Sequence, residues 1–244
     1  MNSLGRNVHM SDQTTLGERV VIGHNVTFRG AVEVGDDTTI LDGAVLGRPP
    51  LTTGNTTREL AAALPALRIG PSCIIGANAV LYTGTTLGAS VMIGDLASLR
   101  EGCRLADQVV IGRGVLVMYQ AVVGARSRII DGAIVTGHMT IEEDVFIGPG
   151  ANSINDNEIY LKRFGLVAPA WHGPVVRRFA VVGASATLAA AVVVGEGALV
   201  APGAMVVRDV PAWTLVAGVP ATERRPVPEQ ERRSILERFG IQGP

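Results

Sequence analysis

Several features are scarce in this chain of 244 residues, and each absence excludes a class of protein. Only two residues are cysteine, so a disulfide framework cannot hold the fold together. Aromatic residues are also scarce, at 4% of the chain. The formal net charge is −1, from 21 basic and 22 acidic residues, which removes the basic field that nucleic-acid binding normally needs. We therefore expect no nucleic-acid partner.

Long apolar runs are also missing, although 47% of the residues are hydrophobic. Glycine, charged or polar residues interrupt every stretch of about 18 residues, so we expect no membrane span and no membrane partner. Residues 1–20 include Arg6, Asp12 and Glu18 and contain no continuous apolar core. This predicts the absence of a secretory signal and a cytoplasmic location.

Glycine and small aliphatic residues are abundant, with 30 glycines in the chain. Such a composition favours a regular structure that turns often and buries small branched side chains. An aliphatic residue indeed recurs at every sixth position through the middle of the chain. The run comprises Ile69, Ile75, Leu81, Leu87, Ile93, Leu99, Leu105, Ile111, Val117, Val123, Ile129, Val135, Ile141 and Ile147. Chance would produce this run less than about once in ten thousand sequences.

The position four residues after each of these anchors holds a mostly small side chain. Cys73 and Cys103 both occupy this position, which explains the two cysteines as buried packing residues without any chemistry. The same period occurs earlier, from Leu16 to Leu46, and later, from Val182 to Val206, each time in a different phase. The phase breaks predict insertions near 47–68 and 153–181.

A period of six residues excludes an amphipathic α-helix and an ordinary antiparallel sheet. Short strands that each end in a turn with Gly, Asn or Asp instead predict a solenoid of stacked parallel strands. Three hexads form a triangular coil, and the repeat predicts about eight coils. We expect this all-β domain over 1–211, and a C-terminal extension over 212–244 with a short helix that caps the open end.

The segments IGPSCIIGANAVLYTGTTLG and VVIGRGVLV resemble the hexapeptide-repeat acyltransferases, and DVPAWTLVAGVPATERR is similar to their C-terminal ending. The stretch MTIEEDVFIGPGANSINDN resembles the branch that acylates amino groups on nucleotide-linked sugars. This resemblance implies a left-handed parallel β-helix and a homotrimer whose sites lie between adjacent helices. It also implies acetyl-CoA or another acyl-CoA as the acyl donor, and a small sugar acceptor.

Residues that are one coil apart in sequence should stack directly above one another. Stacking predicts that Tyr119, Gln120, His138, Asn155 and Asp156 converge on one outer corner of the helix, where the second insertion begins. A neutral imidazole is a suitable base for an acceptor that attacks a thioester, so His138 is the candidate general base. Asp156 would orient the imidazole and stabilise its charged form. Asn155 would position the acceptor.

Each of these assignments has a structural alternative. His138 could be an ordinary solvated turn residue, and the run Asn155-Asp156-Asn157 could simply be an Asx-rich turn. We expect Tyr119, Gln120, Asn157 and Trp171 to contact substrate, although surface packing explains them as well.

For the acyl donor, the resemblance implies backbone contacts at Ala184 and Pro202. Arg208 and Arg225 could bind the phosphates of the cofactor, because a guanidinium makes bidentate, charge-assisted hydrogen bonds. The alternative is that Arg225 only keeps the chain's exit soluble.

The resemblance thus implies an acyltransferase that moves an acetyl group from acetyl-CoA to an amino group of a sugar, most suitably a nucleotide-linked one. A sugar O-acetyltransferase and a non-catalytic scaffold are the alternatives. A carbonic-anhydrase-like zinc site is disfavoured, because His24 and His138 are too far apart in the stack to share an ion. We expect no metal.

Overall fold

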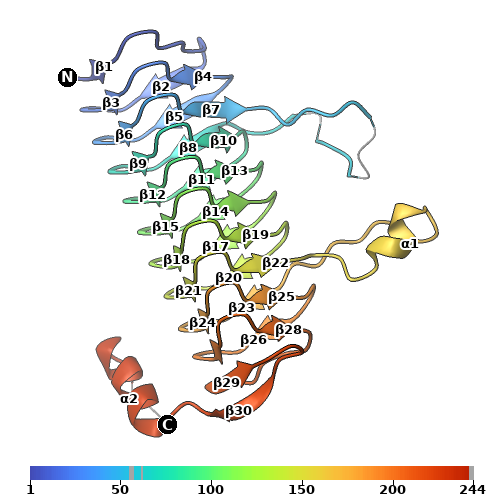
Figure 1. The fold of residues 1–244 in the computed structure, drawn as a ribbon. Helices are drawn as coiled ribbons and strands as arrows, with labels where there is room; N and C mark the ends of the chain where they lie inside the picture. Colours follow the sequence, from blue (N-terminus) through green and yellow to red (C-terminus); the bar gives the residue numbers. More distant parts are fainter. Residues whose placement is uncertain (55–57, 62, 242–244) are drawn as a thin grey trace.

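A computed structural model describes residues 1–54, 58–61 and 63–241. Residues 55–57 and 62, within the expected first insertion, and residues 242–244 of the C-terminal extension lie outside the described residues. Short strands wind into a parallel β-helix with three flat faces, as Figure 1 shows. The prediction of an all-β solenoid of parallel strands is confirmed.

The chain runs repeatedly through three faces, which we name A, B and C in the order of winding. Face A contains β1 (Ser3–Leu4), β3 (Val21–Ile22), β6 (Thr39–Ile40), β9 (Ile74–Ile75), β12 (Met92–Ile93), β15 (Val110–Ile111), β18 (Arg128–Ile129), β21 (Phe146–Ile147), β24 (Val181–Val182), β27 (Leu199–Val200), β29 (Thr214–Ala217) and β30 (Thr222–Pro226). Face B contains β4 (Thr27–Phe28), β7 (Val45–Arg48), β10 (Val80–Tyr82), β13 (Ser98–Leu99), β16 (Leu116–Val117) and β19 (Ile134–Val135), and continues with β22 (Asn152–Ser153), β25 (Thr187–Leu188) and β28 (Met205–Val206). Face C contains β2 (Thr14–Leu16), β5 (Val32–Val34), β8 (Leu67–Ile69), β11 (Thr86–Leu87), β14 (Arg104–Leu105), β17 (Val122–Val123), β20 (Thr140–Ile141), β23 (Val175–Val176) and β26 (Val193–Val194).

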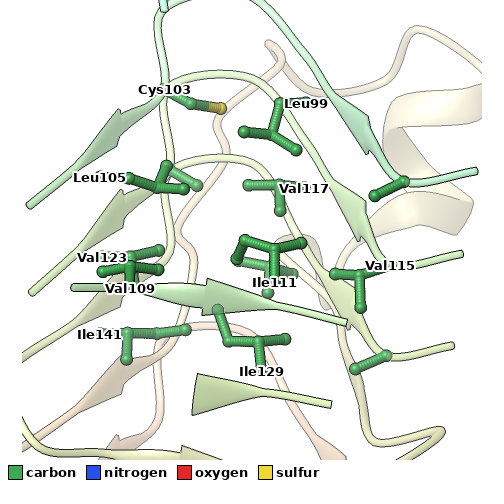
Figure 2. Packing of buried hydrophobic residues seen from close by; sticks show 14 of the residues in the cluster. Leu99, Cys103, Leu105, Val109, Ile111, Val115, Val117, Val123, Ile129 and Ile141 are labelled. Atoms are coloured by element: carbon green, nitrogen blue, oxygen red, sulfur yellow. The ribbon is translucent and has the colours of Figure 1, made fainter. Parts of the chain in front are cut away.

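The core is a narrow aliphatic prism along the helix axis. All fourteen anchors of the six-residue period are buried, and Ile93 pairs with Ile111 in the next coil. Figure 2 shows the side chains of successive coils, among them Leu99, Val117 and Cys103, packed in this interior. Burial raises the pKa of the Cys103 thiol to about 12, so this cysteine is an inert packing residue.

Left-handed backbone at the corners explains the turn residues. Asp37 and Asn78, the last residues of Gly-Asp-Asp and Gly-Ala-Asn, have φ of 57° and 55°. Asp and Asn tolerate this region better than other non-glycine residues, so the sequence can turn at these positions with little strain.

The helix is longer than the expected eight or so coils, because face A has 12 strands. The extra strands lie at both ends. Leu4 continues the early phase of the repeat but is 52% exposed, because no coil covers it. At the other end, Val210 pairs with Val194 after a shift of phase, and β29 and β30 follow.

Both insertions leave the helix at the corner between faces B and C, which we call the B–C corner. The first insertion, 49–66, connects β7 to β8, and the second, 154–174, connects β22 to β23 and contains α1 (Ile159–Arg163). In Figure 1 both project from the same side of the helix. The second is shorter than the expected 153–181, because Val176 already pairs with Ile141 on face C.

The C-terminal helix α2 (Glu229–Arg238) differs in place from the expected cap. The edge of β29 is covered by the antiparallel strand β30. Helix α2 is followed by Phe239, whose ring lies 4.8 Å from that of Phe179, and Arg232 lies over the ring of Trp213. It therefore packs beside the last coils, at the corner between faces C and A. Within the described part of the chain, no helix is long and apolar enough to span a bilayer.

Candidate functional site

Three of the predicted site residues lie along the B–C corner, each just after a strand of face B. Tyr119 follows β16, His138 follows β19 and Asn155 follows β22. Backbone hydrogen bonds connect the successive turns: the N–H of Gln120 donates to Glu101 O at 3.0 Å, and that of His138 donates to Tyr119 O at 3.1 Å. The N–H of His172 donates to Asn155 O at 2.9 Å across the base of the second insertion. The stacked coils therefore hold these residues in one column.

The insertions converge over this column and enclose two adjoining pockets. One has a volume of about 500 Å³ and is lined by Leu51, Arg58, Leu60, Arg100, Tyr119, Asn155, Asp156, Ile159, Lys162, Arg163, Pro169 and Trp171. The other has a volume of about 440 Å³ and is lined by Arg58, Glu59, Gln120, His138, Pro169 and Trp171. Arg58 of the first insertion and Trp171 of the second line both pockets, so neither pocket exists without the two insertions.

His138 combines an exposed turn position with a partly covered ring. Its φ of 61° places it in the left-handed region, and its ring meets Tyr119 edge-on with the centroids 5.3 Å apart. Burial, and then the positive charges of Arg58 and His172, hold the pKa of His138 below its usual value of 6.5. The imidazole is therefore neutral near pH 7, as a general base must be.

Asp156 does not take the expected place beside His138. Its Oδ1 accepts hydrogen bonds from Lys162 Nζ and from the Glu158 N–H, both at 2.8 Å. The reason is that the second insertion begins here, so Gly173 rather than Asp156 lies against His138 in the next coil. Among the described residues, no carboxylate forms a hydrogen bond with the imidazole.

Lys162 and Asp156 form a largely buried ion pair, with side chains 9% and 12% exposed. Burial opposes ionisation of Asp156, but the hydrogen bonds from Lys162 and from the Glu158 N–H outweigh it and lower the pKa of Asp156. Lys162 Nζ also donates to Ala170 O at 2.6 Å. Asp156 therefore stabilises the second insertion, because Lys162 connects it to Ala170 near the other end of the loop.

Tyr119 is packed tightly into the column, and only 8% of it is exposed. Asn155 Nδ2 donates to Tyr119 Oη and to Gly137 O, both at 3.3 Å. The ring lies across Gly137, where an added Cβ would be 2.7 Å from two ring atoms. Glycine at position 137 is therefore what allows Tyr119 to lie between Arg58 and His138.

A Gly137→Ala substitution is expected to displace the Tyr119 ring and to lower kcat/KM about tenfold with a small loss of stability. The new methyl group has no space unless the ring moves, and misplacement of a pocket wall by about 1 Å is costly for catalysis. Steady-state kinetics and thermal unfolding measure the two effects. Gly114→Ala is the control for activity: nothing lies within 4 Å of its added Cβ, so it strains only its own backbone, at a φ of 61°, and leaves the Tyr119 ring in place. Equal activity of the Gly137→Ala variant and the wild type would show that the ring position does not matter.

Of the other residues predicted to contact substrate, two line the pockets and one does not. Gln120 lines the pocket beside His138, and Trp171 lines both pockets. Asn157 instead makes two hydrogen bonds with the backbone of Ala190, at 3.1 and 3.2 Å, so its amide is used in holding the second insertion to the helix.

Three further cationic residues of the pockets were not among the predicted site residues: Arg58, Arg100 and Lys162. Arg58 lies over the Tyr119 ring, 4.0 Å from its centroid, and forms an ion pair with Glu101. Glu101 is 4% exposed and also accepts a hydrogen bond of 2.9 Å from Arg100. Glu101 stands 18 residues, or one coil, before Tyr119, and a carboxylate at that position was the sequence signal for a cationic partner.

The residues predicted to bind the cofactor are spread over three places. Ala184 and Pro202 are neighbours at the corner between faces A and B, where the Gly203 N–H donates to Ala184 O at 2.9 Å. Arg208 follows β28 at the B–C corner, and Arg225 lies on β30 of face A. One chain therefore does not bring Ala184, Pro202 and Arg225 to the His138 pockets.

Histidines are also separated along the stack. His24 belongs to the first coils, where its Nδ1 accepts a hydrogen bond from the Arg6 N–H at 2.8 Å, whereas His138 and His172 lie near the second insertion. In the part of the chain that the structure describes, no group of three or more His, Cys, Asp or Glu residues is arranged to hold a metal ion.

Several known proteins and family models match parts of this sequence. Residues 4–48 match the family of bacterial transferase hexapeptide repeats, and residues 66–95 match the hexapeptide repeat of succinyl-transferases. The bifunctional protein GlmU of Pelobacter propionicus is 31% identical over 188 residues, covering 75% of this chain and 37% of that protein. A 2,3,4,5-tetrahydropyridine-2,6-dicarboxylate N-acetyltransferase of Enterococcus faecalis is 45% identical over 76 residues, covering 30% of this chain and 33% of that protein. The chain thus spans only about a third of the length of the curated relatives it matches.

Solved structures show the same architecture. LpxA, a UDP-N-acetylglucosamine acyltransferase from Bacteroides fragilis, aligns with a TM-score of 0.56 at 14% identity, covering 97% of this chain and 77% of that one. Fold and repeat together define a parallel β-helix of hexapeptide repeats. The chain belongs to the hexapeptide-repeat proteins, and the proteins it resembles include ones named as an N-acetyltransferase and an acyltransferase.

Proposed function

We propose that this protein transfers an acetyl group from acetyl-CoA to an amino group of a sugar, with a nucleotide-linked sugar as the favoured acceptor. The observation that carries the proposal is the convergence of both insertions over the His138–Tyr119 column. The enclosed pockets combine a base, an aromatic wall and cationic side chains. Relatives named as acetyltransferases and acyltransferases support the reaction class.

In the proposed reaction His138 accepts the proton that the acceptor nitrogen loses as it attacks the thioester carbonyl. The C–N bond forms, the C–S bond breaks, and coenzyme A leaves as its thiol with the proton that His138 accepted. Among the residues that the structure describes, no carboxylate forms a hydrogen bond with His138, so its imidazolium is stabilised less than in a His–Asp pair. This suits an amine, which needs less help from a base than an alcohol does. The alternative, a sugar O-acetyltransferase, would depend on His138 more heavily.

The donor site is proposed to include Ala184, Pro202, Arg208 and Arg225. Because these residues do not all face the His138 pockets within one chain, the proposal requires a homotrimer in which adjacent helices complete each site. Arg208 is the exception, because it lies on the same corner as His138. A non-catalytic scaffold remains the alternative from another class.

A thiol-release assay with acetyl-CoA tests this function. We expect turnover with amino sugars, and faster turnover with their nucleotide-linked forms. Release with plain sugars alone would favour the O-acetyltransferase. Thermal shift adds a separate measurement, since a ligand at 100 times its Kd stabilises the folded state by about 2.7 kcal/mol. No stabilisation by millimolar acetyl-CoA, together with no thiol release, would favour the scaffold.

A further inference from the structure

Arginine and tyrosine side chains follow one another along the B–C corner toward the N-terminus of the chain. Arg29, Arg48, Tyr82 and Arg100 stand at or just after the ends of β4, β7, β10 and β13, which are consecutive strands of face B. Tyr82 is the register partner of Arg48. The corner therefore presents three guanidinium groups over four successive coils, and two of them, Arg48 and Arg100, lie near the Tyr82 ring.

The arginines in this region outnumber the carboxylates that pair with them. Arg48 and Arg100 both approach the Tyr82 ring, with their guanidinium carbons 5.3 and 5.2 Å from its centroid. A single cation near a ring is favourable, but two like charges around the same ring repel each other. Glu101 is the one carboxylate that pairs with Arg100, and Arg58 shares it. Neither Arg29 nor Arg48 forms an ion pair within the described residues.

A pocket of about 390 Å³ lies at this position beneath the first insertion. It is lined by Thr27, Arg29, Val45, Arg48, Pro49, Leu51 and Val80. Leu51 also lines the 500 Å³ pocket, so the two cavities are neighbours on either side of this side chain. Coils repeat at about 4.8 Å, so four coils place Arg48 about 20 Å from His138 along the corner.

We propose that Arg29 and Arg48, which lie on neighbouring coils and line this pocket, form a binding site for a phosphate group, most suitably a diphosphate, next to Arg100 in the adjoining pocket. Guanidinium groups bind phosphate oxygens in bidentate fashion, and arginines on neighbouring coils match the extent of two linked phosphates. The bound anion neutralises the like charges around Tyr82. The phosphates belong to the acceptor or to the acyl-CoA, and this assignment alone rests on the proposed function.

Titration calorimetry with inorganic pyrophosphate tests the site without any catalytic step. We expect binding to the full-length protein, weakened about tenfold in Arg48→Gln and in Arg29→Gln, because each loses a charge-assisted contact. Arg104→Gln is the matched control, since Arg104 is an exposed arginine on face C away from the pocket. Thermal unfolding verifies that each variant is folded. The proposal is overturned if pyrophosphate does not bind, or if it binds Arg48→Gln and wild type equally.

Two further ligands identify the source of the phosphates. Uridine diphosphate represents a nucleotide-linked acceptor, and adenosine 3′,5′-bisphosphate represents the nucleotide part of coenzyme A. We expect Arg48→Gln to weaken one of them about tenfold and to raise the KM of the matching substrate with little change in kcat. If pyrophosphate binding depends on Arg48 and no acyl transfer occurs, the site stands and the proposed function fails. Equal binding of both nucleotides by Arg48→Gln and wild type would overturn the site's role in substrate binding.

Discussion

Replacement of His138 by alanine is expected to lower kcat by about two to four powers of ten, the range that general bases contribute. His138 is the one imidazole that lines the pocket shared by both insertions, among the residues that the structure describes. Its pKa is held below 6.5 by burial and by the nearby charges of Arg58 and His172. It can therefore accept a proton at neutral pH without first losing one.

A turn residue needs a control for backbone strain, because alanine is unfavourable at the φ of 61° found at position 138. Gln108→Ala supplies it, since Gln108 has a φ of 59° at another corner of the helix. His138→Asn provides a second variant, because asparagine tolerates the left-handed region. Near-normal kcat in both His138 variants, with the true acceptor, would show that no side chain at this position acts as the base.

The pH dependence follows from the direction of the pKa shift. The neutral imidazole is the active form, so kcat/KM should fall as the pH decreases through the pKa of His138. Because the folded protein lowers that pKa, the acidic limb of the profile is expected below pH 6.5. A profile of kcat/KM from pH 5 to 8 measures it. An acidic limb above pH 7 would assign the titrating group to another residue.

The prism could be predicted almost completely from the sequence, because each hexad repeats the same local rule. A buried anchor, a small inward residue and a left-handed turn recur until the coils close, and neighbouring coils reinforce one another. The rule failed only at the ends. At one end, Leu4 continues the six-residue phase but is exposed. At the other end, the phase shifts before Val210, so the period did not predict the strands that follow.

The site could be predicted only where it depends on that repeat. Stacking by one coil correctly gave the neighbourhood of Tyr119 and His138. It failed for Asp156, because the chain leaves the helix there and Gly173 takes the next place in the column. Arg58 could not be predicted, since its insertion has no six-residue period and Glu101 lies two coils beyond the strand from which the insertion leaves. Such a contact depends on how a loop folds back, which spacing in the sequence does not encode.

Replacement of Arg58 is expected to have the second large effect on kcat/KM, because Arg58 connects the first insertion to the column of residues beneath the second insertion. Its guanidinium pairs with Glu101, whose side chain is 5% exposed, and covers the ring of Tyr119. Breaking a buried ion pair by removing one partner costs about 3 to 5 kcal/mol. If this free energy holds the insertion closed, Arg58→Gln should lower kcat/KM about a hundredfold.

A matched pair separates this contact from an ordinary surface interaction. Arg68 and Glu33 form an ion pair on face C with side chains 63% and 50% exposed, so Arg68→Gln should change kcat/KM by less than about twofold. The double variant Arg58→Gln with Glu101→Gln should be less than additive, because both changes remove the same contact. Arg58→Gln should also move the acidic limb of the pH profile upward, because the positive charge of Arg58 lowers the pKa of His138. Additive losses with an unshifted limb would mean that Arg58 contacts substrate independently of Glu101 and does not tune the base.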